Sequence, residues 1–415
     1  MKAEIIAVGT ELLLGDILNT DAQYLSKQLS SLGIEMYHQA VVGDNAQRLE
    51  EVLKEAFSRS DLVITSGGLG PTGDDLTKET GCKIFGKKLV EDEKALEMLK
   101  DFFNKLNREI TENNYKQALV PEGSIVLYNE NGTAPGIMID ENGKILVMLP
   151  GPPKELVPMF EKYVRPYLAS KQEYMFVSRV LRIAKVGESK TEYVIRDLIE
   201  NQTNPTIATY VKNIEVIVRI TAKAKSEEEA NALIDPVANE IYKRLGNNVY
   251  GEGETTLPVV MCKRLLRDKI TVAVSESCTG GMLSTAFTDV PGISEIFMEG
   301  AVTYSNDAKM RRLGVKKETL DKYGAVSAET AAEMAEGIAK SAGTDIGLST
   351  TGIAGPGGGT DEKPVGLVYI GLCVYGKTIT KELHFTGNRE RIRTRTVDAV
   401  FDALRRELDE REQNS

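Results

Sequence analysis

A serine at the junction of a predicted strand and a predicted helix is the first residue in this chain that could do chemistry. Ser277 follows the alternating apolar segment 270–274 and precedes Gly280 and Gly281, after which a helical pattern begins. Such a turn holds a side chain between two rigid elements, and the free N–H groups that start the helix can stabilise an anion formed beside it. The glycines allow a substrate to approach the backbone closely. The pattern therefore predicts a nucleophile at Ser277.

The scarcity of histidine indicates which base would serve this serine. The two histidines of the chain, His38 and His384, both lie in alternating apolar segments typical of strands, so a Ser-His-Asp triad is not expected. Tyr304 and Lys309 are the polar residues that follow Ser277 at helix-and-loop distance. A lysine can act as the base if burial or a neighbouring cation lowers its pKa from about 10.4 towards about 7. A capping serine, a core tyrosine and a surface lysine are the alternative interpretation.

The neighbouring Cys278 is a rival nucleophile, because a thiol at a helix N-terminus becomes more acidic. A nearby lysine and tyrosine nevertheless favour the serine, since a hydroxyl needs a base far more than a thiol does. We therefore expect Ser277 to attack, with Lys309 accepting its proton and Tyr304 orienting or relaying it.

A glycine-rich loop at residues 350–359 follows another predicted strand. Successive backbone N–H groups around Gly352 and Gly355 would form a concavity suited to a phosphate or a developing oxyanion. A flexible surface loop is the alternative. Arg389, at the start of the last predicted helix, is a candidate clamp for a phosphate. Further arginines within 391–395 make a solvated basic face an equally good interpretation.

A second glycine-rich loop, at residues 65–75, also runs from a strand to the start of a helix. Adjacent carboxylates beside a phosphate-sized cradle predict a site for Mg²⁺ or a similar hard cation, although a helix-capping role is as good an interpretation of Asp75. Two more carboxylates end neighbouring strands, so we expect oxygen ligands to converge there. The candidate phosphate-binding residues are Gly67, Gly68, Gly70 and Thr72, and the candidate metal ligands are Asp74, Asp75, Glu11 and Asp44.

The composition narrows the class of protein. A net charge of −10 argues against nucleic acid and against anionic membranes as main partners. No apolar stretch approaches the roughly 20 residues that span a bilayer, so a cytoplasmic location is expected. The four cysteines are scattered, which predicts neither a disulfide framework nor a structural zinc site.

The elements that must position these residues fall into three predicted domains. Residues 1–168 alternate strands and helices around a parallel sheet, and a hairpin across Asn142-Gly143 makes the domain mixed. Residues 170–250 indicate a small two-layer α/β unit, followed by a predicted linker at 251–254. Residues 255–412 alternate again. Both glycine-rich loops and the Ser277 turn then lie at the carboxyl ends of strands, where open α/β sheets bind ligands.

At these residues the chain resembles the CinA family of competence/damage-inducible proteins over essentially its full length. The resemblance implies an N-terminal molybdopterin-binding-like (MoaB/MogA-type) three-layer domain, a KH-like α+β middle domain and a C-terminal α/β amidohydrolase domain. It also implies a homodimer. The matching motifs are residues 9–15, 67–72, 131–136, 149–153, 276–281, 304–306 and 352–356.

For the C-terminal domain the resemblance implies hydrolysis of the amide of nicotinamide mononucleotide, which gives nicotinic acid mononucleotide and ammonia without a cofactor. The catalytic residues of the family fall on Ser277, Tyr304 and Lys309, and the family's hydroxyl in the glycine loop falls on Thr351. The alternative class is a non-catalytic nucleotide-binding accessory protein of competence or DNA uptake. The intact serine, tyrosine and lysine favour the enzyme, because a pure sensor needs no nucleophile.

For the N-terminal domain the resemblance implies an ADP-ribose pyrophosphatase that uses a divalent metal (Mg, Mn or Co), with potassium as a further candidate cation. Two residues depart from the family pattern. Asp21 stands where asparagine is expected, and Ser66 stands where threonine is expected. Both changes are conservative, so we expect them to alter the metal preference more than the activity.

Overall fold

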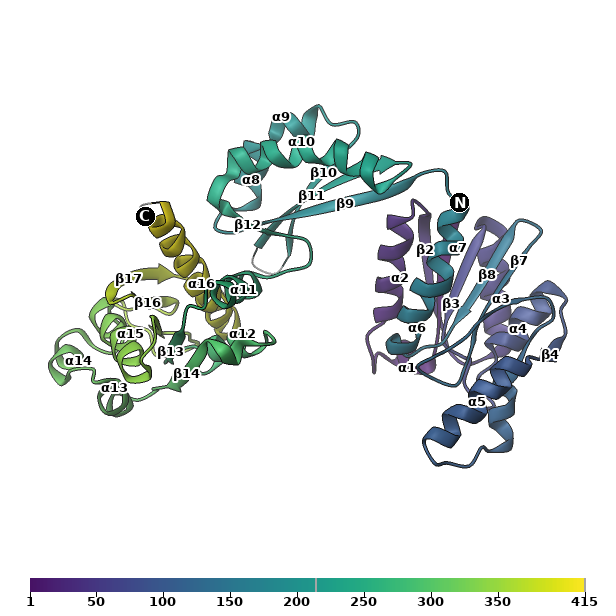
Figure 1. The fold of residues 1–415 in the computed structure, drawn as a ribbon, viewed down its shortest axis with the longest axis horizontal. Coiled ribbons are helices and arrows are strands. Elements are labelled where there is room, and N and C mark those ends of the chain that lie inside the picture. The colour runs from purple at the N-terminus through teal and green to yellow at the C-terminus, as the bar shows by residue number, and fades with distance from the viewer. Residues whose placement is uncertain (213–214, 414–415) are drawn as a thin grey trace. The chain divides into compact units, whose positions relative to one another are not determined.

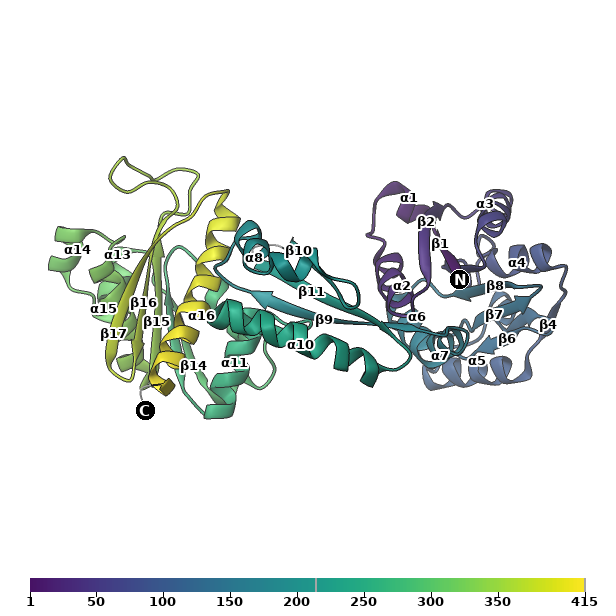
Figure 2. The same cartoon turned by 90° about the horizontal axis from the view of Figure 1, so that it is seen from above.

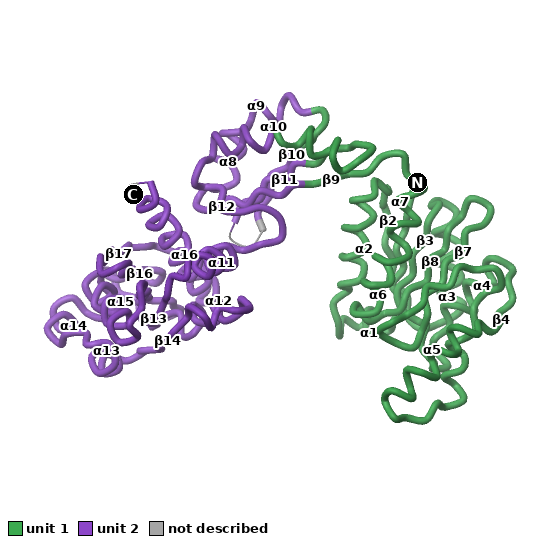
Figure 3. The backbone as a smooth tube through the Cα atoms, viewed as in Figure 1, with its two compact units in different colours: residues 1–178, 203–206, 221–236 green, residues 179–202, 207–220, 237–415 purple. Residues whose placement is uncertain are grey.

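A computed structural model describes residues 1–212 and 215–413 of the chain (Figure 1). The chain divides into two compact units (Figure 3). Unit 1 comprises residues 1–178, 203–206 and 221–236, and unit 2 comprises residues 179–202, 207–220 and 237–415. No helix among the described residues is long and apolar enough to cross a membrane.

Unit 1 is built on a six-stranded sheet with the order β2-β1-β3-β8-β7-β6. The first four strands in that order pair in parallel, and β7 and β6 join antiparallel. Asn142 and Gly143, with φ of 53° and 74°, connect β7 to β8 in the left-handed conformation that a tight hairpin turn requires. The prediction of a mixed sheet is confirmed. The strands are β1 (Lys2–Val8), β2 (Glu35–Val42), β3 (Leu62–Ser66), β6 (Ile125–Leu127), β7 (Gly136–Glu141) and β8 (Lys144–Leu149).

Helices cover both faces of this sheet, so its central strands are buried on both sides. Ile5 of β1 packs with α2, α6 and α7, whereas the adjacent Ile6 packs with α3 on the opposite face. This alternation produces three layers. Sequence patterning did not anticipate α1, α5 or the small sheet of β4 and β5. The bounds are α1 (Thr10–Leu14), α2 (Thr20–Ser31), α3 (Ala46–Arg59), α4 (Thr77–Phe85), α5 (Glu93–Lys105), α6 (Pro153–Met159), α7 (Arg165–Ser170), β4 (Leu89–Glu91) and β5 (Leu119–Pro121).

The middle of the chain forms a four-stranded sheet with the order β10-β11-β9-β12. The predicted linker at 251–254 is partly wrong, because Gly251 and Glu252 belong to β12, which pairs antiparallel with β9. Strand β10 was not predicted. The elements are β9 (Met175–Ile183), α8 (Glu188–Val194), α9 (Arg196–Glu200), β10 (Thr206–Lys212), β11 (Glu215–Ala224), α10 (Glu227–Leu245) and β12 (Val249–Glu252).

The C-terminal part of unit 2 is a five-stranded sheet with the order β14-β13-β15-β16-β17. Strand β13 is central and pairs in parallel with β14 and β15, while β16 and β17 are antiparallel. Helices α15 and α16 cover opposite faces (Figure 2). The carboxyl ends of the three parallel strands therefore meet at one edge. The bounds are α11 (Leu257–Asp268), β13 (Val272–Glu276), α12 (Met282–Thr288), β14 (Phe297–Val302), α13 (Asn306–Leu313), α14 (Lys317–Tyr323), α15 (Ala328–Ala342), β15 (Ile346–Gly352), β16 (Leu367–Val374), β17 (Lys377–His384) and α16 (Arg389–Gln413).

Candidate active site

Ser277 lies at the predicted turn, immediately after the last residue of β13 and before α12. Its N–H donates to the carbonyl oxygen of Thr350 on β15 at 2.9 Å, so the turn is tied to the neighbouring strand. The side chain is almost fully buried, with 9% of its surface exposed. The parallel pairing of β13 thus places the hydroxyl group at the shared edge of the sheet.

Lys309 is brought to this serine by α13, whose N-terminus is capped by Ser305. The Lys309 Nζ atom lies 3.0 Å from Ser277 Oγ. It also lies 2.8 Å from the carbonyl oxygen of Thr303 and 3.3 Å from that of Tyr304. The lysine is 1% exposed. Burial disfavours the ammonium form and lowers the pKa of Lys309 from 10.5 to about 8.

Three oxygen atoms surround Nζ of Lys309, and the protonation state decides how it bonds to them. An uncharged amine has two N–H donors and one lone pair. As an ammonium, Lys309 donates to Ser277 Oγ and to the carbonyl oxygens of Thr303 and Tyr304. After it loses a proton, the amine can keep its two bonds to the carbonyl oxygens and turn its lone pair towards the Ser277 hydroxyl. The predicted pairing of serine and lysine is therefore present as a hydrogen-bonded contact.

Glu276, the residue before the serine, is a functional group that sequence reasoning did not assign. Its carboxylate is fully buried and accepts the N–H groups of Gly281, Leu283 and Ser284 at 2.8 to 3.0 Å. The Ser284 hydroxyl donates to it at 2.6 Å. The carboxylate therefore holds the start of α12 in place. In the described part of the chain, no acceptor is recorded for the N–H groups of Thr279 and Gly280.

Cys278 lies beside the nucleophile but in an unreactive environment. The thiol is 5% exposed, and burial raises its pKa to about 11. The acidification expected of a thiol at a helix N-terminus does not occur, because desolvation outweighs it. The geometry favours Ser277 over Cys278.

Tyr304 and Arg389 contact each other rather than Ser277. The phenol is 62% exposed, and its Oη lies 3.3 Å from Nη2 of Arg389. Arg389 also donates from Nη1 to the carbonyl oxygen of Gly355 at 2.7 Å, which ties it to the glycine-rich loop. The described structure records no hydrogen bond from the phenol to Ser277 or Lys309, so the relay by Tyr304 stays a prediction.

Among the other arginines of α16, Arg393 also reaches the site. Its Nη2 donates to the carbonyl oxygen of Thr279 at 2.5 Å, in the serine turn. A Cβ atom at Gly280 would lie 3.5 Å from the same nitrogen. The sequence pattern could not indicate which of these arginines reach the site, because all of them fit a basic helix face.

The Thr351 hydroxyl has a partner in the loop that precedes α15. It donates to the carbonyl oxygen of Ala325 at 2.6 Å. The neighbouring Thr350 lies on the other face of β15, where its Oγ1 is 2.7 Å from that of Thr279 in the serine turn. Side chains alternate along a strand, and Ser275 and Ser349 both donate to carbonyl oxygens of α15, so Thr351 lies on the face of the sheet that α15 covers. The catalytic role of Thr351 stays a prediction.

The glycines of this loop are required by packing. A Cβ atom at Gly352 would approach Val368 Cγ2 to 2.7 Å, and one at Gly355 would approach Val365 Cγ1 to 2.6 Å. Both distances are too short for a side chain. The loop is therefore held close to β16 and to the segment that precedes it.

The glycine-rich loop of unit 1 follows β3 as predicted. Gly67, with φ of 101°, leaves no room for a Cβ atom against the carbonyl oxygen of Val8, and Gly68 leaves none against Thr77. A Cβ atom at Gly70 would lie 2.5 Å from a carboxylate oxygen of Asp75. These glycines permit a close approach of the loop to β1 and α4.

The four predicted metal ligands are not gathered into one centre. Asp44 accepts from the N–H and hydroxyl groups of Thr10 at 2.9 and 2.8 Å. Asp75 accepts from the N–H group of Thr72 at 2.9 Å and from its hydroxyl. Among the described residues, no group of three or more His, Cys, Asp or Glu could hold a metal ion. The expected convergence of oxygen ligands is thus not seen among the described residues, and the metal site stays a prediction.

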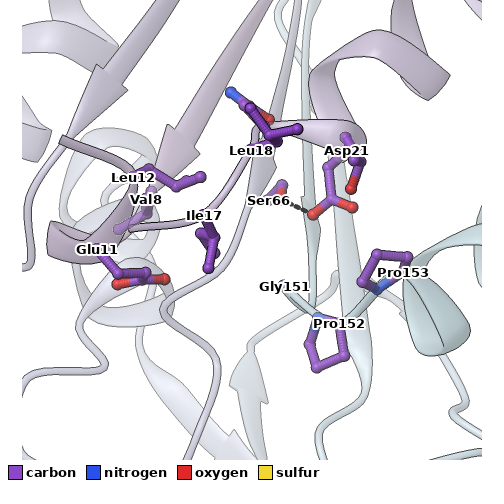
Figure 4. Close-up of a pocket in the computed structure, with 12 residues that line it drawn as sticks. Val8, Glu11, Leu12, Ile17, Leu18, Asp21, Ser66, Gly151, Pro152 and Pro153 are labelled. Carbon is purple, nitrogen blue, oxygen red and sulfur yellow. Dashed lines mark hydrogen bonds between the residues drawn. The ribbon is translucent and has the colours of Figure 1, made fainter. Parts of the chain in front are cut away.

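A cavity of about 320 Å³ lies beside this loop (Figure 4). Glu11 lines it, as do Asp21 and Ser66, the two departures from the family pattern. The Ser66 hydroxyl donates to Oδ2 of Asp21 at 2.5 Å, so the two departures form one contact. Sequence reasoning treated them as independent because they are far apart in the chain.

Three family models match successive parts of the chain. They are described as "Probable molybdopterin binding domain" (residues 4–170), "Damage-inducible protein CinA KH domain" (residues 178–251) and "CinA C-terminal domain" (residues 254–408). A relative from Clostridium acetobutylicum, named "Putative competence-damage inducible protein", is 59% identical over 98% of this chain and 99% of its own length. The chain belongs to the CinA family.

Two further proteins are similar to this chain. A "CinA-like protein" from Kosmotoga olearia is 57% identical over 98% of this chain and 99% of its own length. A crystal structure of the competence damage-inducible protein A from Klebsiella pneumoniae is 35% identical, with a TM-score of 0.36, and the match covers 37% of this chain and 95% of that one. The family matches confirm the predicted fold class: a molybdopterin-binding-like domain, a KH domain and a CinA C-terminal domain in that order.

Proposed function

We propose that the C-terminal site hydrolyses the carboxamide of nicotinamide mononucleotide. The observation that carries the proposal is the contact of 3.0 Å between Ser277 Oγ and Nζ of Lys309, a lysine that is almost fully buried and whose pKa burial lowers to about 8. The serine proton passes to Nζ as Oγ attacks the carboxamide carbon. The C–N bond then breaks, ammonia leaves with a proton returned by the lysine, and an acyl-enzyme remains. Water hydrolyses this ester to nicotinic acid mononucleotide and restores the serine.

Charge that develops on the carboxamide oxygen needs hydrogen-bond donors. The N–H groups of Thr279 and Gly280, for which the described structure records no acceptor, lie in the turn that Glu276 holds rigid. Preorganised donors of this kind stabilise an oxyanion without reorganisation. Arg389 beside the glycine-rich loop is the proposed contact for the phosphate.

Ammonia release from nicotinamide mononucleotide by the purified chain tests this function. We expect steady release by the parent protein and none above background by Ser277→Ala. Free nicotinamide should be a much poorer substrate, because it lacks the phosphate. No release from the mononucleotide by a folded parent protein would reject the amidase. Binding of the mononucleotide without turnover would favour the alternative, a nucleotide-binding accessory protein.

For unit 1 we propose hydrolysis of ADP-ribose to AMP and ribose 5-phosphate. The glycine-rich loop and Thr72 are the proposed phosphate-binding groups. A divalent ion is usually bound through one or two carboxylates together with the phosphates of a substrate, and Asp74 and Asp75 are the residues that would hold it. Hydrogen bonding holds the pKa of the exposed Asp74 below its usual range, so this carboxylate stays ionised. The ion would neutralise charge as the pyrophosphate bond breaks.

A further inference from the structure

The carboxyl group of Asp21 is buried, and only one of its two oxygen atoms has a recorded hydrogen-bond partner in the described structure. The side chain lies in the first turn of α2 and is 9% exposed. Oδ2 accepts from Ser66, but Oδ1 has no recorded partner in the described part of the chain. A buried carboxylate oxygen without a partner costs folding free energy, so folded proteins rarely retain one without a reason.

The cavity around this carboxyl group is lined by both polar and apolar residues. In Figure 4 the carboxyl group lies between Ser66 and the side of the cavity formed by Pro152 and Pro153. Leu12, Ile17 and Leu18 add apolar surface, and Ile17 and Leu18 are 53% and 86% exposed. Large apolar side chains that stay exposed beside a cavity commonly mark a ligand site.

The charge of this cavity disfavours a phosphate as its occupant. Asp21 and Glu11 are both acidic, and the described residues that line the cavity include no lysine or arginine. Burial raises the pKa of Asp21, whereas the hydrogen bond from Ser66 lowers it. In either protonation state, Oδ1 can accept a hydrogen bond. A neutral group that carries hydroxyl donors and some apolar surface is therefore the matching chemistry.

The cavity is continuous with the proposed phosphate-binding loop. Ser66 is the last residue of β3 and precedes Gly67 directly. Gly151, which lines the cavity, lies so close that a Cβ atom there would be 3.6 Å from Gly67 Cα. A nucleotide whose phosphates contact the loop would therefore direct an attached sugar towards Asp21.

We propose that this cavity binds a ribosyl group of the nucleotide, with Oδ1 of Asp21 accepting hydrogen bonds from its hydroxyl groups. Carboxylates bind ribose hydroxyls in this way in dinucleotide-binding folds. The inference rests on the proposed binding of ADP-ribose by unit 1, and adds which part of the ligand each surface recognises.

Two probes separate the ribosyl contact from the phosphate contact. The methylene-bridged analogue of ADP-ribose keeps both ribosyl groups and cannot be hydrolysed at the bridge, whereas methylenediphosphonate has no ribosyl group. Calorimetric titration of the full chain should show Asp21→Ala binding the analogue at least about tenfold more weakly than the parent, or about 1.4 kcal/mol. Its affinity for methylenediphosphonate should stay within about twofold. Asp16→Ala removes an exposed carboxylate of the same segment and is the matched control.

The isosteric Asp21→Asn variant shows whether removal of the charge strengthens or weakens binding of each probe. It also keeps the size of the side chain, so the test does not depend on the folding of the alanine variant. Removal of a negative charge alone would make both anionic probes bind more tightly. Loss of a charged acceptor for hydroxyl groups predicts weaker binding of the analogue only. Equal affinities of the parent and Asp21→Ala for the analogue, a parallel loss for both probes, or no binding of the analogue by the parent would overturn the inference. Binding of the analogue by the parent without hydrolysis of ADP-ribose would reject the proposed hydrolysis and leave the ribosyl site standing.

Discussion

The pH dependence of the amidase reports directly on Lys309. With a pKa of about 8, roughly one tenth of this lysine is neutral at pH 7 and roughly nine tenths at pH 9. Because only the neutral amine can accept the proton of Ser277, kcat/KM for nicotinamide mononucleotide should rise about tenfold between these two values and then level off. The assay is ammonia release measured from pH 6 to pH 10 at substrate concentrations well below KM.

Two variants separate Lys309 from other titrating groups. Lys309→Ala should lose about 10² to 10⁴ in kcat and, with the base removed, show no rise near pH 8. Cys278→Ala should keep the parent profile, because the cysteine is not the nucleophile. A rise near pH 8 that persists in Lys309→Ala would refute the assignment, as would a parent profile that is flat across this range.

The same pKa shift makes a prediction about stability. The folded pKa of Lys309 lies below its unfolded value of 10.5, so between about pH 8 and pH 10.5 the unfolded chain binds more protons and the free energy of unfolding rises with pH. At pH 7 the buried ammonium therefore costs ~3 kcal/mol relative to a neutral side chain. Lys309→Met should raise the unfolding temperature at pH 7 by more than it does at pH 10. A larger gain at pH 10 would contradict the argument.

The remaining predictions concern the other site residues. Ser277→Ala should lose most of kcat while it still binds the mononucleotide, and Cys278→Ala should stay within about tenfold of the parent, or roughly 1.4 kcal/mol; an active Ser277→Ala that iodoacetamide then inactivates would reverse the assignment. Arg389→Ala should raise KM for the mononucleotide about tenfold or more, since charge-assisted contacts contribute about 1.5 to 3 kcal/mol; an equal effect on free nicotinamide would show that it binds no phosphate. Cleavage of ADP-ribose should stop in excess EDTA, and full cleavage there would remove the metal from the proposal. Asp74→Ala with Asp75→Ala should abolish that cleavage, and persistent activity would place the metal elsewhere.

Local sequence was sufficient to predict the elements that carry both sites. Alternating apolar residues followed by glycines specify a strand that ends in a turn, and these patterns depend only on residues near each other in the chain. The turn at Ser277, the hairpin at Asn142-Gly143 and the loop at Gly67 were predictable for this reason. The end of strand β12, Gly251 and Glu252, was mistaken for part of a linker, because glycine and glutamate carry no strand signal and the pairing partner β9 lies far away in the sequence.

Tertiary structure decided which side chains meet and in which protonation state. The pKa of Lys309 depends on its burial, and its contact with Ser277 depends on the packing of α13 against the sheet. The direction of the Thr351 hydroxyl depends on which face of β15 it occupies. The contact between Asp21 and Ser66 joins α2 to β3. Desolvation and hydrogen-bond geometry are properties of the folded surroundings, so the sequence by itself determined the residue types and their local positions, and only the fold determined their partners.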